Sequence, residues 1–135
     1  MGVKKDLESQ FDYDIVDEFM DHYEITCEML EPIILSLNKA NMYERDVNEL
    51  FRVAHNLKSA SGFLKLKLLH KLAAFMENTL EKARSQEGPA SEEFIDWLLL
   101  ISDQLNSWLK NLKNDDEEFV PFDRKILYVP EHLEN

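Results

Sequence analysis

The sequence contains few of the residues that interrupt or cross-link a chain. Three glycines and four prolines among 135 residues are too few for the closely spaced turns of a β-sandwich or β-barrel, which favours long helices. The single cysteine, Cys27, excludes an internal disulfide framework and a cysteine-rich zinc site. No apolar run is longer than that from Trp97 to Ile101, which is far too short to span a bilayer, and the first residues lack the apolar stretch of a signal peptide. We therefore expect a soluble, cytoplasmic protein.

Basic residues are also scarce. Fifteen Lys and Arg stand against 27 Asp and Glu, so the net charge is −12, and this argues against binding to nucleic acid or to a membrane surface. The imbalance is uneven along the chain. Residues 1–31 contain ten acids and two bases, whereas residues 52–84 contain seven bases and two acids. An otherwise acidic protein thus has one basic stretch, which would attract an acidic partner.

The pattern that the sequence does contain is helical periodicity. Apolar residues recur every three or four positions from Asp12 to about Asn38, from about Glu44 to the neighbourhood of Gly62, from Leu69 to Ala83, and from Ser91 to Leu112. With 44% hydrophobic residues, the chain has enough apolar side chains for one core. Four amphipathic helices joined by short loops bury their apolar faces most simply as an antiparallel bundle. We expect an all-α four-helix bundle formed by residues 1–113.

Particular residues predict where these helices begin, bend or end. Pro32 lies inside the first periodic segment, where it lacks an N–H donor and crowds the preceding turn, so we expect a kink or a restart near Glu31. Asp46, followed by Glu49, resembles a capping pair for the second helix. Ser91 is a suitable N-cap for the fourth helix.

Residues 114–135 differ in composition from the predicted bundle. Four consecutive acids, Asp115 to Glu118, predict a solvated linker. The tail that follows has apolar residues between Phe119 and Val129, and this leaves two possibilities open. It packs back onto the bundle, or it serves as a docking peptide. A linker of this kind suits a stand-alone protein as well as the first domain of a longer kinase.

The segment from Phe51 to Gly62 has an unusual outer face. On a helical wheel His55 lies opposite the predicted core face, which contains Leu50, Val53, Ala54, Leu57, Ala60, Ser61 and Leu64. Most surface histidines have no special task, but exposed helix faces usually carry long charged side chains, and here Ser59 and Gly62 leave a bare strip beside the ring. Glycine costs about 1 kcal/mol relative to alanine inside a helix, so we expect Gly62 to clear space or to end the helix.

His55-Asn56-Leu57-Lys58, followed by Ser59-Ala60-Ser61-Gly62, resembles the histidine phosphotransfer domains of bacterial phosphorelays. The similarity is closest to the N-terminal phosphotransfer domain of chemotaxis histidine kinases. It extends over Leu50 to Pro89, and Met76 to Arg84 resembles the next helix of that family. The helices on either side agree with the family only in pattern.

The resemblance implies a phosphoryl carrier. The family's histidine accepts phosphate on Nε2 and passes it to an aspartate of a response-regulator receiver domain, and His55 is the matching residue. Glu77 matches the glutamate that accepts a hydrogen bond from the histidine Nδ1–H, which fixes the tautomer with a free Nε2 lone pair. Lys58 matches the family lysine and would balance the phosphoryl charge.

The resemblance also sets expectations about partners and cofactors. Ser59 and Lys65 replace glycines that the family usually has, which puts the choice of partner in question more than the carrier chemistry. We expect a docking surface formed by Phe51, Ser59, Gly62 and Leu66. No cofactor or metal is expected in this chain, because the receiver domain supplies the magnesium ion, and the sequence has no nucleotide-binding signature for phosphorylation from ATP. A monomer that meets a receiver domain, a histidine kinase or both is expected.

Two other functions fit the same helical pattern. One is a phosphorylation-independent adaptor that binds a receiver or kinase domain through the same face, and the other is a purely structural helical module. The remaining histidines add little to the choice. His22 lies among acids without a second His or Cys at metal-ligand spacing, which favours a solvated helix over a metal site. His70 is near Glu77 in helical phase and could perturb it, but we expect it to be an ordinary exposed residue; His132 lies in the tail.

Overall fold

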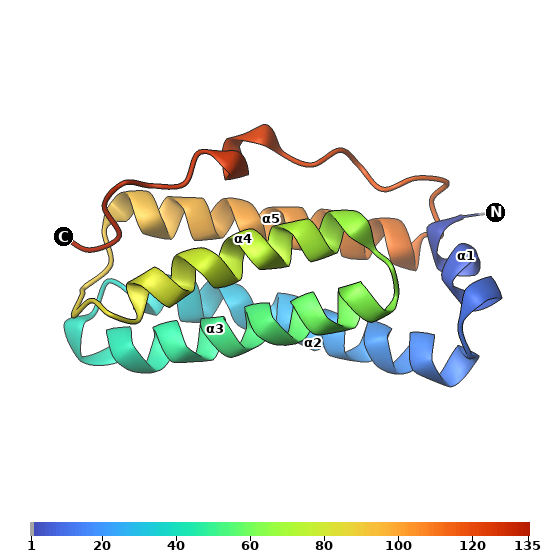
Figure 1. Ribbon diagram of the computed structural model, residues 1–135, viewed down its shortest axis with the longest axis horizontal. Coiled ribbons are helices and arrows are strands. Elements are labelled where there is room, and N and C mark those ends of the chain that lie inside the picture. Colours follow the sequence, from blue (N-terminus) through green and yellow to red (C-terminus); the bar gives the residue numbers. More distant parts are fainter. Residues whose placement is uncertain (1) are drawn as a thin grey trace.

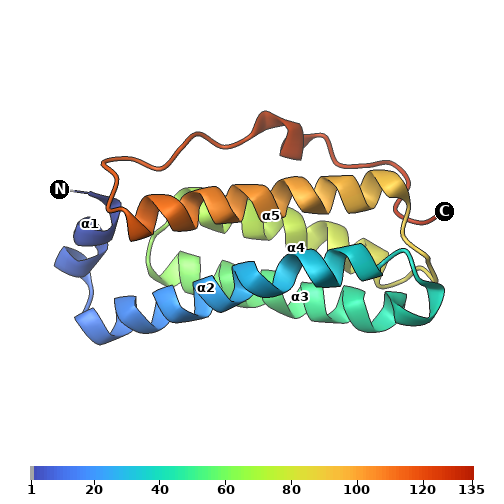
Figure 2. The ribbon, with the colours of Figure 1, turned by 180° about the vertical axis from the view of Figure 1, so that it is seen from behind.

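The computed structural model describes residues 2–135, and its regular elements over that range are all helical (Figure 1). Four long helices form an antiparallel up-and-down bundle, a short helix lies across one end, and the C-terminal segment runs along the outside (Figures 1 and 2). The all-α fold predicted from the sequence is confirmed. The elements in chain order are α1 (Val3–Gln10), α2 (Tyr13–Ser36), α3 (Ala40–Phe63), α4 (Lys67–Ala83), α5 (Glu92–Lys113) and the 3-10 helix η1 (Arg124–Leu127).

The core lies between the apolar faces of α2, α3, α4 and α5. Two phenols inside it are paired with helix carbonyls. Tyr23 Oη donates to Leu105 O at 2.6 Å, and Tyr43 Oη donates to Ala83 O at 3.0 Å, so neither buried hydroxyl is left without a partner. The largest fully buried side chains are Trp108, Tyr23, Tyr43, Phe94, Leu30, Ile34, Leu37, Leu50, Leu72, Met76, Leu80 and Leu98.

Helix α2 runs through Pro32 without a restart and ends at Ser36. Proline removes one backbone hydrogen bond, but Leu30 and Ile34 on either side of it are fully buried against the core. Packing of this apolar stripe therefore holds the last turns of the helix in place. Of the two outcomes expected at Glu31, the restart is excluded.

Helix α3 begins earlier than the sequence predicts, and the predicted capping pair is wrong. Its first residue is Ala40, and Asp46 lies buried inside the helix instead of at its start. The carboxylate of Asp46 accepts a hydrogen bond from Ser36 Oγ and lies 3.3 Å from Arg45 Nη2. Asp46 therefore ties the end of α2 to α3. The cap expected at Ser91 is present, since its Oγ accepts a hydrogen bond from the Phe94 N–H at 3.1 Å.

The connection from α3 to α4 is a tight turn with a left-handed residue. Lys65 has φ +59°, its N–H donates to Gly62 O at 3.2 Å, and the Leu66 N–H donates to Ser61 O at 2.9 Å. These two bonds are those of a Schellman motif, in which glycine usually holds the left-handed position. A lysine at this point carries a steric cost that a glycine would avoid.

Helix α1 was not predicted, and it is held by two acids that follow the C-terminal end of α5. Its buried residues are Val3 and Leu7. The Lys5 N–H donates to Asp115 Oδ1 at 3.1 Å, and the Val3 N–H donates to Asp116 O at 2.7 Å. Asp115 and Asp116 are therefore not a simple solvated linker, because they satisfy backbone donors in the first turn of α1.

The tail packs back onto the bundle, which decides between the two possibilities left by the sequence. Trp97 Nε1–H donates to Ile126 O at 2.8 Å, and Trp108 Nε1–H donates to Val120 O at 2.9 Å. Ile126 and Leu133 of the tail are buried. The two indoles of α5 thus fix the path of the segment that runs beside this helix (Figure 2). Within residues 2–135, no helix is both long and apolar enough to cross a membrane.

Candidate functional site

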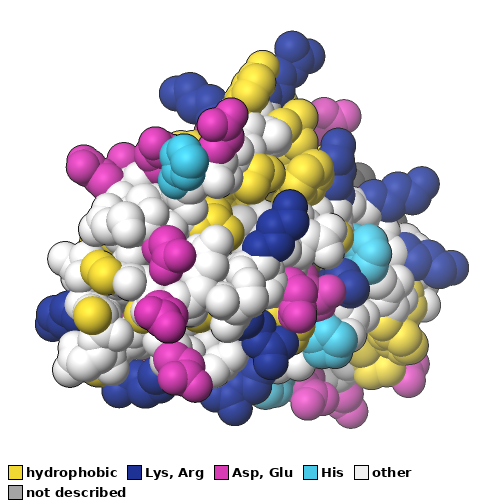
Figure 3. Space-filling view, turned by 60° about the vertical axis from the view of Figure 1, so that its left-hand side comes forward, with side chains coloured by type: hydrophobic (Ala, Val, Ile, Leu, Met, Phe, Trp, Pro, Cys, Tyr) yellow, Lys and Arg dark blue, Asp and Glu magenta, His cyan; other side chains and the backbone are white. Residues whose placement is uncertain are grey.

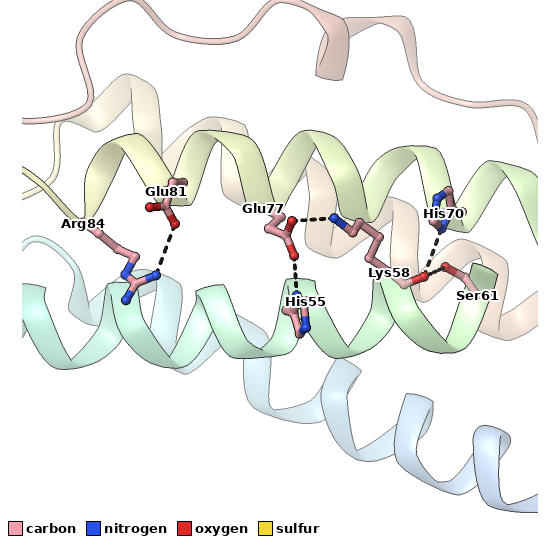
Figure 4. A network of polar contacts seen from close by, with 7 residues as sticks. All are labelled: His55, Lys58, Ser61, His70, Glu77, Glu81 and Arg84. Carbon is pink, nitrogen blue, oxygen red and sulfur yellow. Dashed lines mark hydrogen bonds and ion pairs between the residues drawn. The ribbon is translucent and has the colours of Figure 1, made fainter. Parts of the chain in front are cut away.

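The candidate site lies on the outer surface of the α3–α4 pair (Figure 4). Val53, Ala54 and Leu57 face the core from α3 and are buried, so the intervening His55 points away from the core, as the helical wheel predicts. The imidazole side chain is 59% exposed. Glu77 projects from α4 toward it.

One carboxylate joins the two predicted partners of the site. Glu77 Oε2 lies 2.8 Å from His55 Nδ1, and Glu77 Oε1 accepts a hydrogen bond from Lys58 Nζ at 2.6 Å. Because a carboxylate only accepts hydrogen bonds, the neutral imidazole must carry its proton on Nδ1. The lone pair is then on Nε2, on the opposite side of an exposed ring.

The same contacts keep the Glu77 carboxylate charged. The hydrogen bond from Lys58 is the main reason that the pKa of Glu77 lies below its ordinary value of 4.5, and the bond to His55 lowers the pKa further, whereas burial acts in the opposite direction. The Glu77 side chain is only 13% exposed. A nearly buried, ionised acceptor is therefore fixed at Nδ1 at neutral pH, with an ammonium group beside it.

Phe51 and Arg84 form a second set of contacts at the site. The rings of Phe51 and His55 are nearly parallel, with an angle of 11° between their planes and 6.5 Å between their centroids. Arg84 Cζ lies 4.4 Å from the centroid of the Phe51 ring, and Arg84 Nη1 lies 3.2 Å from Glu81 Oε2. Arg84 was assigned no role from the sequence. The antiparallel pairing of two helices is the signal that could have placed it opposite Phe51.

The other residues of the expected docking surface lie further along α3, toward its turn into α4. Ser59 and Gly62 are exposed, and Leu66 is half-buried against the core. A Cβ on Gly62 would lie 3.3 Å from two atoms of the His70 ring, so Gly62 clears space for that side chain. His70 is exposed, as expected, but its Nδ1 lies 3.0 Å from Lys58 O and so links the start of α4 to α3.

One face of the molecule is mixed in charge and polarity. The face drawn in Figure 3 shows basic, acidic and histidine side chains interspersed with uncovered apolar areas. Within residues 2–135, no group of three His, Cys, Asp or Glu side chains is arranged to hold a metal ion. His22 Nε2 lies 3.7 Å from Glu18 Oε1 on the acidic surface of α2.

Two known proteins are similar in sequence to this chain. The chemotaxis protein CheA of Salmonella typhimurium is 27% identical over 104 residues, which are 77% of this chain and 16% of that protein. The sensor histidine kinase CheAY of Helicobacter pylori is 34% identical over 68 residues, which are 50% of this chain and 8% of that protein. The chain thus spans less than a fifth of the length of either relative. No solved structure gives a significant match.

The match to a protein family covers most of the chain. The model of the Hpt domain family matches residues 17–115, from the first turns of α2 to just beyond α5, and therefore includes every residue of the site described above. The chain belongs to the Hpt, or histidine phosphotransfer, domain family.

Proposed function

We propose that this chain carries a phosphoryl group on His55 Nε2 and exchanges it with an aspartate of a response-regulator receiver domain. Membership of the Hpt family implies histidine phosphotransfer in a phosphorelay. The observation that supports His55 as the carrier is the 2.8 Å contact between its Nδ1 and Glu77, on a ring whose other side is open to solvent. A histidine kinase would be the other partner, which agrees with the name of one relative, the sensor histidine kinase CheAY.

The reaction requires one nucleophile and little else from this chain. The Nε2 lone pair attacks phosphorus of an aspartyl phosphate, the nitrogen–phosphorus bond forms, and the bond to the carboxyl oxygen breaks with its electrons left on the aspartate. The proton stays on Nδ1, so the phosphorylated ring is an imidazolium. Its positive charge is stabilised by the Glu77 carboxylate. The reverse step returns the phosphoryl group to an aspartate.

Lys58 supplies the positive charge nearest to this pair. In the structure its ammonium group binds Glu77 at 2.6 Å, and its side chain is 34% exposed. A flexible lysine one turn from His55 can reach the incoming phosphoryl oxygens while it remains close to the carboxylate. The basic stretch formed by residues 52–84 favours the approach of an acidic receiver pocket.

Transfer of label between two proteins tests the proposal. The chain is incubated with a receiver domain that carries radioactive phosphate on its aspartate, and with a histidine kinase and labelled ATP in a parallel reaction. Label on the chain should be acid-labile and alkali-stable, absent from His55→Gln, and retained by the matched variant His132→Gln, which alters an exposed histidine of the tail. Absence of label from the wild-type chain with every receiver and kinase of the host would refute the proposal.

The same experiment separates transfer from adaptor function. An adaptor would bind the receiver or kinase domain tightly, and His55→Gln would leave both the affinity and the lack of label unchanged. Binding is measured by calorimetry with the same proteins. A phosphoryl carrier instead shows label that depends on residue 55.

A further inference from the structure

Phe51 lies one helical turn before His55 on α3. Helical side chains lean toward the N-terminus of their helix, so the imidazole of His55 lies over the turn that contains Phe51. The 11° angle between the two ring planes shows that they lie nearly parallel. Phe51 thus provides a flat neighbour for the imidazole.

Phe51 is itself held from α4. It is half-buried, and the Arg84 guanidinium lies 4.4 Å from its ring centroid, within the range of a cation–π contact. Arg84 is in turn paired with Glu81 at 3.2 Å. Figure 4 shows Arg84 and Glu81 on one side of the His55–Glu77 pair and Lys58 on the other. Two series of contacts therefore meet at His55: one runs from Lys58 through Glu77, and the other runs from Arg84 through Phe51.

A single hydrogen bond does not fix the orientation of a ring. The contact between Nδ1 and Glu77 anchors one atom, but the imidazole can still pivot about that contact, and Nε2 would then move through an arc. A nearly parallel aromatic ring with its centroid 6.5 Å away favours one orientation of the imidazole plane, because neighbouring aromatic rings prefer an offset-parallel arrangement. In-line attack on phosphorus needs a defined direction of the Nε2 lone pair.

We infer that Phe51, held in place by Arg84, is a positioning residue that sets the plane of the His55 ring. This inference rests on the proposed function and deepens it, and it replaces the expected role of Phe51 as part of the docking surface. Phe51 does not touch the phosphoryl group and acts only through His55. Arg84 acts one step further away, through Phe51.

The kinetic test separates positioning from docking. Single-turnover transfer from a phosphorylated receiver is measured at increasing receiver concentration, which gives a maximal rate and a half-saturating concentration. Phe51→Leu should lower the maximal rate about tenfold and leave the half-saturating concentration within about twofold. Phe51→Tyr, which keeps the ring, should restore the rate, and Arg84→Gln should give a smaller loss without changing a buried residue.

A matched control checks that the effect is local. Phe122 of the tail is also a half-buried phenylalanine with a cation over its ring, since Lys71 Nζ lies 5.4 Å from its centroid. Phe122→Leu should leave both kinetic constants unchanged. An increase in the half-saturating concentration for Phe51→Leu, with the maximal rate intact, would overturn the inference in favour of docking.

A measurement on the isolated chain makes the inference independent of transfer. Carbon-13 NMR relaxation of the His55 ring reports its order on the picosecond-to-nanosecond scale. The order parameter should fall in Phe51→Leu and return to the wild-type value in Phe51→Tyr. If the wild-type chain accepts no label, the proposed function fails while this result still decides the role of Phe51. Unchanged ring order in Phe51→Leu would overturn it.

Discussion

Replacing Glu77 with glutamine removes the charge opposite His55 while it keeps the size of the side chain. An imidazolium and a carboxylate separated by 2.8 Å attract each other by about 1.5 kcal/mol in the dielectric of bulk water. The bulk value is a lower limit for this pair, because the His55 side chain is 59% exposed whereas the Glu77 side chain is only 13% exposed. Glutamine has only one oxygen that accepts hydrogen bonds, and both His55 Nδ1–H and the Lys58 ammonium donate. One of these two donors would therefore face the amide NH2 group, which also donates.

The loss of about 1.5 kcal/mol corresponds to roughly a tenfold change in an equilibrium constant. We therefore expect Glu77→Gln to shift the equilibrium between phosphorylated receiver and phosphorylated chain about tenfold toward the receiver. The carboxylate stabilises the positive charge that phosphorylation adds to the neutral imidazole, so the product is affected more than the free chain.

The assay measures how label is divided between the two proteins at equilibrium, with unlabelled competitor used to show that equilibrium has been reached. Glu44→Gln, which neutralises an exposed acid on α3, is the matched control and should leave the ratio unchanged. A wild-type ratio in Glu77→Gln, or an equal shift in Glu44→Gln, would refute the assignment of charge stabilisation to Glu77.

Three further predictions concern stability and reactivity. Lys65→Gly should raise the free energy of unfolding in urea by about 0.5–1 kcal/mol because Lys65 has φ +59°, whereas Lys65→Ala should give no gain. Burial, with help from nearby acids, raises the pKa of Cys27 to about 12, so iodoacetamide at pH 8 should label this thiol slowly in the folded protein and rapidly in urea. Equal rates would contradict its burial. The contacts that lower the pKa of Glu77 stabilise the folded state. This contribution is complete above the unfolded-state pKa of 4.5 and is lost as the pH falls through the lower folded-state pKa. The difference between the unfolding energies of wild type and Glu77→Gln should therefore shrink as the pH falls below 4.5.

The sequence could predict the features that depend on local periodicity. The spacing of apolar residues gives four long helices, and the same periodicity places His55 opposite the buried Ala54 and Leu57. The serine cap of α5 is also local, because Ser91 and Phe94 are three residues apart. The pairing of His55 with Glu77 was available only through resemblance to the family, since periodicity does not say which helices are neighbours.

The features that the sequence could not predict depend on contacts between distant residues. Helix α1 has eight residues, too few to be stable alone, and its first turn is capped by Asp115 from the other end of the chain. Asp46 looked like a helix cap because Glu49 follows three residues later, whereas its actual partner, Ser36, belongs to another helix. The tail follows α5 because the two indole N–H groups need acceptors once they are buried, and nothing in its own pattern specifies this path.

The tight turn after α3 connects the local sequence to the geometry of the site. In an antiparallel pair, residue numbers rise on one helix as they fall on the other, and the contacts of Phe51 with Arg84 and of His55 with Glu77 follow this rule. The Schellman turn at Lys65 fixes the offset between the two helices. One added residue in this turn would advance α4 by about 1.5 Å and rotate it by about 100°, which would turn Glu77 away from His55. The conformation of Lys65 thus helps to determine whether the carboxylate can reach the imidazole, and this strained residue lies at the point where the register of the site is set.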